Sequence, residues 1–202
     1  MEPIALQELV RRCQRTLPDD PRAFEQLVAT YKARVFTMAY RLMGNHQEAE
    51  DQAQEVFLKV YRSIKTLNDP ATFVGWLDRI TTNTCFDALN KQQRRPTTTS
   101  LTPTSDTAGD EPRWIDARSL SPEEAALRQE LRECLERTLA RLDLTGRAAL
   151  ILRDIDDHSY QEIAEILGIG LSAVKMRIHR TRLAFQELLD VICPGVRRER
   201  AT

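Results

Sequence analysis

A stretch rich in threonine, serine and proline divides this chain into two parts. Ten of the twelve residues from 96 to 107 are Thr, Ser or Pro, and several acidic residues follow them. Such a composition buries too little apolar surface to offset the entropy of ordering the backbone. We therefore expect a flexible acidic linker at residues 96–121, between one body at residues 1–95 and a second at residues 122–193. A basic tail is expected at residues 194–202.

Apolar residues recur at helical spacing on both sides of this linker. In the first body they predict helices over about 4–16, 24–42, 47–64 and 73–91, and in the second over about 122–142, 145–155, 160–167 and 172–189. Ser121, Ser159 and Ser172 are the expected N-caps of three of these helices. The chain has only 7 glycines, too few for a fold built from tight hairpins. The predicted fold is all-α, with two small helical domains joined by a flexible linker.

The N-terminus and the cysteines indicate where such a chain works. Met-Glu-Pro-Ile has neither a basic start nor a following apolar run, so no secretory signal is expected, and no apolar stretch is long enough to insert into a membrane. The cysteines are far apart, at Cys13, Cys85, Cys134 and Cys193. We therefore expect reduced thiols and a cytoplasmic location.

Signs of catalysis are weak. His46, His158 and His179 are scattered, and no cysteine pair has zinc spacing. The Gly168-Ile-Gly170 turn lacks the third glycine and the preceding strand of a dinucleotide loop. The acidic run that leads to His158 is interpreted as a polar turn at a helix end. The sequence thus predicts no enzyme, no metal site and no cofactor.

The second body contains a pattern typical of a helix-turn-helix. Ser159 and Glu162 form a capping box before a short apolar helix, a glycine turn follows, and the next helix is basic. On a helical wheel, one face of this basic helix is apolar and the opposite face holds basic and short polar residues. Such a face can enter a major groove. An ordinary solvated basic face is the alternative.

Three segments together resemble a known family. Residues 48–61 (EAEDQAQEVFLKVY) resemble the polymerase-binding helix of bacterial sigma factors. Residues 73–83 (FVGWLDRITTN), continued to residue 95, resemble their promoter-melting helices, and residues 159–182 resemble their C-terminal helix-turn-helix. The order and separation match the extracytoplasmic-function (ECF, group 4) sigma factors of the sigma-70 family.

The resemblance implies that the acidic helix docks on core RNA polymerase. Its contacts would be with the coiled coil of the largest subunit, and the second body would meet the flap. The expected docking residues are Asp51, Gln54, Glu55 and Leu58. Acidic and amide groups around an apolar anchor suit a basic partner surface. An ordinary solvated acidic face is again the alternative.

The resemblance places the next helix at the −10 element. The Asn83 amide can both donate and accept, which suits the edge of a flipped base. Four basic residues would hold strand phosphates, namely Arg79, Lys91, Arg94 and Arg95. A helix-exposed Asn83 without a role is the alternative. Trp76 could stack on a base, but its position on the apolar stripe favours the core.

The resemblance assigns the −35 element to the basic helix. The expected contacts are Ser172, Lys175, Met176, Arg177, His179, Arg180 and Arg182. Lys175 and Met176 replace the arginine and small residue that are frequent in the family, which leaves the promoter sequence open. His179 could instead be a plain surface residue.

The predicted function is that of an alternative sigma factor. It would direct core RNA polymerase to −35/−10 promoters and help to melt the −10 duplex, and an anti-sigma factor that controls it is implied by resemblance. Two rivals remain: a two-domain regulator with a response-regulator type of helix-turn-helix, and an adaptor or antagonist protein. A receiver domain would need alternating strands, and an antagonist would not need the acid-free basic helix.

Overall fold

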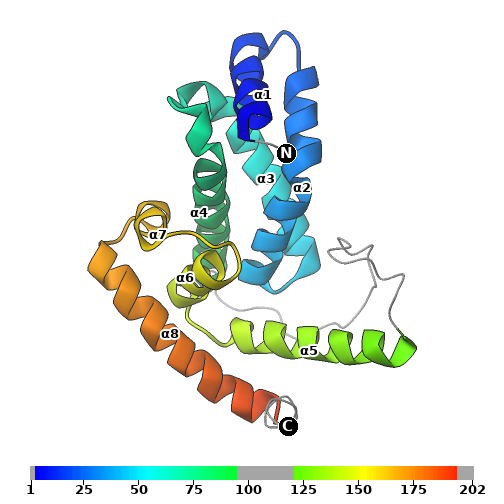
Figure 1. Ribbon diagram of the computed structural model, residues 1–202, viewed down its shortest axis with the longest axis vertical. Helices are drawn as coiled ribbons and strands as arrows, with labels where there is room; N and C mark the ends of the chain where they lie inside the picture. Colours follow the sequence, from blue (N-terminus) through cyan, green and yellow to red (C-terminus); the bar gives the residue numbers. More distant parts are fainter. Residues whose placement is uncertain (1–2, 95–120, 195–202) are drawn as a thin grey trace.

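The computed structural model describes residues 3–94 and 121–194, which form two groups of helices and contain no β-strand (Figure 1). The first group consists of α1 (Pro3–Thr16), α2 (Arg22–Met43), α3 (His46–Ser63) and α4 (Phe73–Arg94), with short 3-10 turns η1 (Ile64–Thr66) and η2 (Pro70–Thr72) between α3 and α4. The second consists of α5 (Pro122–Ala140), α6 (Leu144–Asp154), α7 (Tyr160–Leu167) and α8 (Leu171–Ile192). The all-α prediction is confirmed. The expected linker lies outside the described residues except for its last residue, Ser121, which caps α5.

Local sequence signals set most of the helix ends. The Asn45 side chain accepts from the Glu48 backbone N–H at 3.0 Å and begins α3. Capping boxes begin α5 at Ser121 and α7 at Ser159, as the sequence predicts. The prediction that Ser172 caps the last helix is wrong. Gly170 supplies the extended cap backbone, with φ −66° and ψ 149°, so Ser172 falls inside the first turn of α8.

The first group of helices packs around its own apolar core. Val10, Leu27, Val56 and Phe73 from α1 to α4 are fully enclosed. Trp76 is half-buried and packs against this core, as expected from its place on the apolar stripe of α4.

A second apolar core is shared by the two groups. Ala39 and Leu42 of α2 and Cys85 of α4 belong to the same buried cluster as Ile151 of α6 and Ile163 of α7. Accordingly, α7 packs against α4 and α6 packs against α2 (Figure 1). The two groups of helices are therefore packed against each other.

Arg147 of α6 ties the two groups together at the end of α2. Its Nη1 donates to the Leu42 carbonyl at 2.7 Å, and its Nη2 donates to the Ala140 carbonyl at 2.7 Å. The side chain is only 8% exposed, and burial lowers its pKa. A cation at the last carbonyls of a helix is favourable because those groups lack partners in the helix.

The cysteines differ from the expectation of four reduced thiols. Cys134 of α5 and Cys193, just after α8, form a disulfide with their Cα atoms 6.2 Å apart. Cys13 and Cys85 are free and buried, and burial raises the pKa of Cys85 to about 12. The expectation is wrong for the bonded pair, because α8 folds back along α5 and brings together residues 59 positions apart.

No helix within residues 3–94 and 121–194 is long and apolar enough to cross a membrane.

Candidate nucleic-acid interface

The residues expected to bind the polymerase form one stripe along α3. Asp51, Gln54, Glu55 and Leu58 recur at intervals of three and four, so they share one side of the helix. Asp51 and Gln54 are exposed, Glu55 is half-buried and Leu58 is 50% exposed. The opposite side of α3 lies in the core. The stripe therefore presents acidic and amide groups around an exposed leucine, which suits a basic surface with apolar contacts.

A groove separates this stripe from α4. Its lining residues come from both helices and include Glu48, Glu55, Lys59, Thr84, Asp87 and Lys91. Lys59 Nζ donates to Thr84 Oγ1 at 3.0 Å, and Gln92 Nε2 donates to Glu48 Oε1 at 2.6 Å. These bonds hold α3 and α4 side by side, so the acidic stripe and the outer side of α4 form one continuous surface.

The outer side of α4 carries the expected −10 residues. Arg79 and Asn83 are exposed one turn apart, and Lys91 is exposed two turns beyond Asn83. The exposed Asp87 lies between Asn83 and Lys91 on the same side. An amide is thus flanked by cations along one face of a helix that is anchored by its buried face. Arg94 ends α4 with a side chain that is not described, and Arg95 lies outside the described residues.

The basic side of α8 is free for a ligand along its first turns. Ser172, Lys175, His179 and Arg180 are exposed, and Met176 is 54% exposed. Val174, Ile178 and Thr181 are buried on the opposite side. The helical-wheel prediction is confirmed. Lysine and arginine can donate to guanine edges and a methionine can contact a thymine methyl group, so this side has the chemistry of base readout.

Arg177 and Arg182 have partners within their own domain. Arg177 Nη1 donates to Asp143 Oδ1 at 2.9 Å, and Arg182 Nε donates to Asp154 Oδ2 at 3.0 Å. A second, shorter contact joins Arg182 Nη2 to Asp154 Oδ1. The hydrogen bond to Asp154 raises the pKa of Arg182. Neither acidic partner could be predicted from the local sequence pattern, because they lie 34 and 28 residues away.

These two ion pairs hold α8 against both ends of α6. Asp143 is the N-cap of α6 and also accepts from the Gly146 backbone N–H at 2.9 Å, while Asp154 is the last residue of α6. The guanidinium of Arg153 lies 4.9 Å and the Lys175 Nζ lies 6.0 Å from the centre of the Tyr160 ring on α7. The orientation of the exposed basic side is thus fixed by side chains on α6 and α7.

A short helix, a glycine in the left-handed region and a longer basic helix define a helix-turn-helix. Tyr160–Leu167 is the short helix, Gly168 has φ 65°, and Leu171–Ile192 is the longer helix. Within residues 3–94 and 121–194, no cluster of His, Cys, Asp or Glu could hold a metal ion. The fold and these surfaces define a helical, two-part DNA-binding protein.

Comparisons with known proteins identify the family. Residues 27–95 match the model of Sigma-70 region 2, and residues 132–185 match the model of Sigma-70, region 4. The chain is 34% identical over 189 residues to the RNA polymerase sigma-H factor of Pseudomonas aeruginosa, covering 91% of this chain and 93% of that protein. It is 33% identical over 202 residues to the ECF RNA polymerase sigma-E factor of Escherichia coli K12, covering 98% and 99%.

Solved structures show the same fold. CnrH in complex with the cytosolic domain of CnrY is 26% identical, with a TM-score of 0.62 over 93% of this chain and 98% of that one. The sigma factor RpoE in complex with the anti-sigma factor NepR from Bartonella quintana is 22% identical, with a TM-score of 0.60 over 83% and 97%.

The chain belongs to the sigma-70 family and is an ECF sigma factor. It is a transcription initiation factor that acts with core RNA polymerase on promoter DNA, and it is not an enzyme.

Proposed function

We propose that three surfaces divide the work of initiation in this sigma factor. The acidic stripe of α3 docks on the coiled coil of the polymerase's largest subunit, the Asn83 side of α4 holds the −10 element, and the basic side of α8 enters the −35 major groove. The observation that supports this most is the continuity of the α3 stripe with the outer side of α4. A polymerase bound at Asp51, Gln54, Glu55 and Leu58 would have the −10 strand beside Asn83.

At the −10 element, Asn83 receives a flipped base, because its amide can match donors and acceptors on an unstacked base edge. Arg79 and Lys91 lie one and two turns away on the same side of α4. They contact the phosphates of the melted strand, together with Arg94 and Arg95.

At the −35 element, Ser172, Lys175, Met176, His179 and Arg180 face the bases and the nearest phosphates. Arg177 and Arg182 act at the edge of this surface and keep α8 in place through Asp143 and Asp154. The flap of the polymerase holds the second group of helices over this part of the promoter.

The finer placement of the protein is also a proposal. We assign it to group 4 of the sigma-70 family and to the cytoplasm, with region 2 at residues 1–95, the linker at 96–121, region 4 at 122–193 and a basic tail at 194–202. An anti-sigma factor controls it. The solved structure of RpoE with an anti-sigma factor supports this partner. The rival two-domain regulator is disfavoured, because a receiver domain needs strands and residues 3–94 contain none.

In-vitro transcription tests the proposal. Core polymerase free of other sigma factors is mixed with genomic DNA fragments, with and without the protein, and the start sites are mapped. We expect discrete new start sites that share upstream elements. Asn83→Ala and Arg180→Ala are each expected to reduce them at least tenfold, because each removes a direct contact to a base. Val191→Asp, at an exposed position near the end of α8 and outside the three surfaces, is the control. Absence of protein-dependent start sites would refute the proposal.

A further inference from the structure

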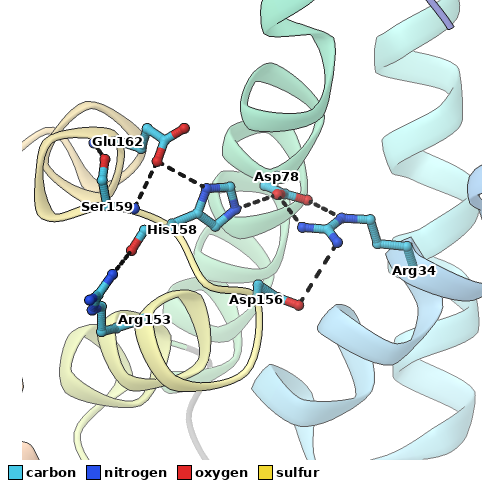
Figure 2. Close-up of polar contacts among 7 residues, drawn as sticks. All are labelled: Arg34, Asp78, Arg153, Asp156, His158, Ser159 and Glu162. Atoms are coloured by element: carbon cyan, nitrogen blue, oxygen red, sulfur yellow. Dashed lines mark hydrogen bonds and ion pairs between the residues drawn. The ribbon is translucent and has the colours of Figure 1, made fainter. Parts of the chain in front are cut away.

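A buried carboxylate on α4 joins the two groups of helices. Asp78 is 1% exposed, and it accepts from Arg34 of α2, at 3.0 Å from Nε and 2.7 Å from Nη2. Its Oδ2 also lies 2.7 Å from Nε2 of His158, in the turn between α6 and α7 (Figure 2). Asp78 is therefore shared by a cation from its own group and by a histidine from the second group.

The rest of this cluster holds His158 in place. The Arg153 guanidinium donates to the His158 carbonyl at 2.8 Å, and Asp156, in the same turn, approaches Arg34 Nη1 at 4.0 Å (Figure 2). Glu162 Oε2 lies 3.9 Å from the other ring nitrogen, Nδ1. The histidine side chain is only 8% exposed. A buried carboxylate is costly without partners. Arg34 compensates part of this cost from within the first group, and His158 is a partner only while the two groups are together.

Among the described residues, other contacts between the two groups include the shared apolar core, the Arg147 hydrogen bond to the Leu42 carbonyl, and the bond from the Tyr40 hydroxyl to Glu136 at 3.0 Å. These three contacts do not involve the three functional surfaces. Asn83 on α4 and the basic side of α8 stay exposed. The closed arrangement thus leaves Asn83 and the exposed residues on the basic side of α8 accessible to DNA.

The two DNA-reading surfaces lie too close together in this structure to bind the −10 and −35 elements of one promoter at the same time. The −35 and −10 elements lie about 25 base pairs apart, or roughly 85 Å at ~3.4 Å per base pair. Asn83 follows Asp78 by five residues on α4, His158 bonds to Asp78, and Lys175 Nζ lies 6.0 Å from the Tyr160 ring, two residues beyond His158. These links keep Asn83 and Lys175 within about 40 Å of each other. The closed chain cannot reach both elements of one promoter.

We propose that the Arg34–Asp78–His158 cluster is an intramolecular latch that keeps the free sigma factor closed and must open before both promoter elements can be bound. The inference rests on the proposed roles of Asn83 and Lys175. The α3 stripe is exposed in the closed form, so core polymerase can dock first and opening follows. The latch acts without an anti-sigma factor, because its contacts all come from this chain.

Protonation of His158 strengthens the latch. The hydrogen bond to Asp78 raises the pKa of His158 against the opposing effect of burial. The charged groups that face the ring are Asp78 from α4, Glu162 from α7, and Arg34 and Asp156 around the carboxylate. In the open form the pKa returns toward about 6.5. The added stability of the closed form is therefore fully present below about pH 6.5. It is lost as the pH rises through the higher pKa that His158 has in the closed form.

Fluorescence energy transfer in the full-length protein tests the latch. Dyes are attached through unnatural amino acids at Arg62 on α3 and Glu187 on α8, which are both exposed and lie in different groups of helices. Transfer is measured between pH 6 and pH 8.5 without polymerase or DNA. We expect high transfer at pH 6 that falls toward pH 8.5. His158→Ala removes a hydrogen bond to a charged group. We therefore expect it to lower the ratio of closed to open molecules roughly tenfold or more.

Two further variants make the result specific. His158→Gln keeps a donor for Asp78 but cannot titrate, so it is expected to close more than His158→Ala and to lose the pH dependence. His46→Gln removes an exposed histidine at the start of α3, outside the three functional surfaces, and is expected to behave like the wild type. If His158→Ala shows wild-type transfer and a wild-type pH profile, the latch is refuted. If the proposed promoter contacts are wrong, start-site mapping with Asn83→Ala and Arg180→Ala will show it, while the energy-transfer signal stays unchanged.

Discussion

Arg182 has two possible roles, which the Arg182–Asp154 ion pair allows us to distinguish. It either positions α8 on α6 or contacts a DNA phosphate, and the two roles predict opposite effects of Asp154→Ala on promoter affinity. If Arg182 serves mainly to hold α8 on α6, then Asp154→Ala weakens −35 binding just as Arg182→Ala does. The two side chains are 46% and 35% exposed, so the pair contributes at most about 1 kcal/mol, the upper end for exposed pairs. We therefore expect each variant to lose about two- to five-fold in promoter affinity, and the double variant to lose no more than either single one.

The assay is the salt dependence of holoenzyme binding to a promoter mapped by transcription. A phosphate contact contributes about 0.9 to the slope of log affinity against log salt, so a positioning role predicts an unchanged slope in both variants. Glu165→Ala is the matched control, because it removes an exposed acid from α7 without breaking this bridge. Tighter binding in Asp154→Ala, together with a slope lowered by about 0.9 in Arg182→Ala, would show that Arg182 contacts a phosphate and refute the reasoning.

Three further predictions concern packing, docking and the disulfide. A Cβ at Gly146 would lie 2.6 Å from Thr181 Oγ1, so Gly146→Ala is expected to cost about 1–3 kcal/mol; an unchanged urea midpoint would contradict this. Leu58→Asp should weaken core-polymerase binding about tenfold or more by removing an exposed apolar anchor, and equal binding in a pull-down titration would argue against the α3 stripe. Cys134→Ser opens a loop of 59 residues and should cost up to about 4 kcal/mol in the chain-entropy model. A reductant should lower the melting temperature of the wild type but not of this variant, and equal sensitivity of both would count against the disulfide.

The sequence predicted the features that depend on neighbouring residues. Helical periodicity placed Val174 and Ile178 inside and Lys175 and Arg180 outside on α8, and the capping box at Ser159 began α7 where expected. Such features are local, because a helix face and a cap are set within one or two turns.

Contacts between distant helices could not be predicted in this way. His158 and Asp78 are 80 residues apart, and nothing in either local pattern indicates that α7 packs on α4. A weaker signal was available: Asp78 shares the inward side of α4 with Leu77 and Thr81, where an acid is costly without a partner. It predicts a buried partner for Asp78 without identifying His158.

The same limit applies to Arg147 and the disulfide. Arg147 lies beside the apolar run from residue 148 to 152, which marks it as a buried cation, but its acceptor on α2 is 105 residues away. The pairing of Cys134 with Cys193 depends on the path of α8 along α5. Both depend on tertiary packing rather than on periodicity.

The most direct test of the account is photo-crosslinking in the open promoter complex. A photoreactive amino acid replaces Asn83 in one holoenzyme and His179, next to Arg180, in another, and the crosslinked nucleotides are mapped. We predict that position 83 reacts with the non-template strand of the −10 element and position 179 with the −35 duplex, about 25 base pairs upstream. Crosslinks from both positions to neighbouring nucleotides, or in the reverse order along the DNA, would contradict the assigned surfaces and the opening of the chain.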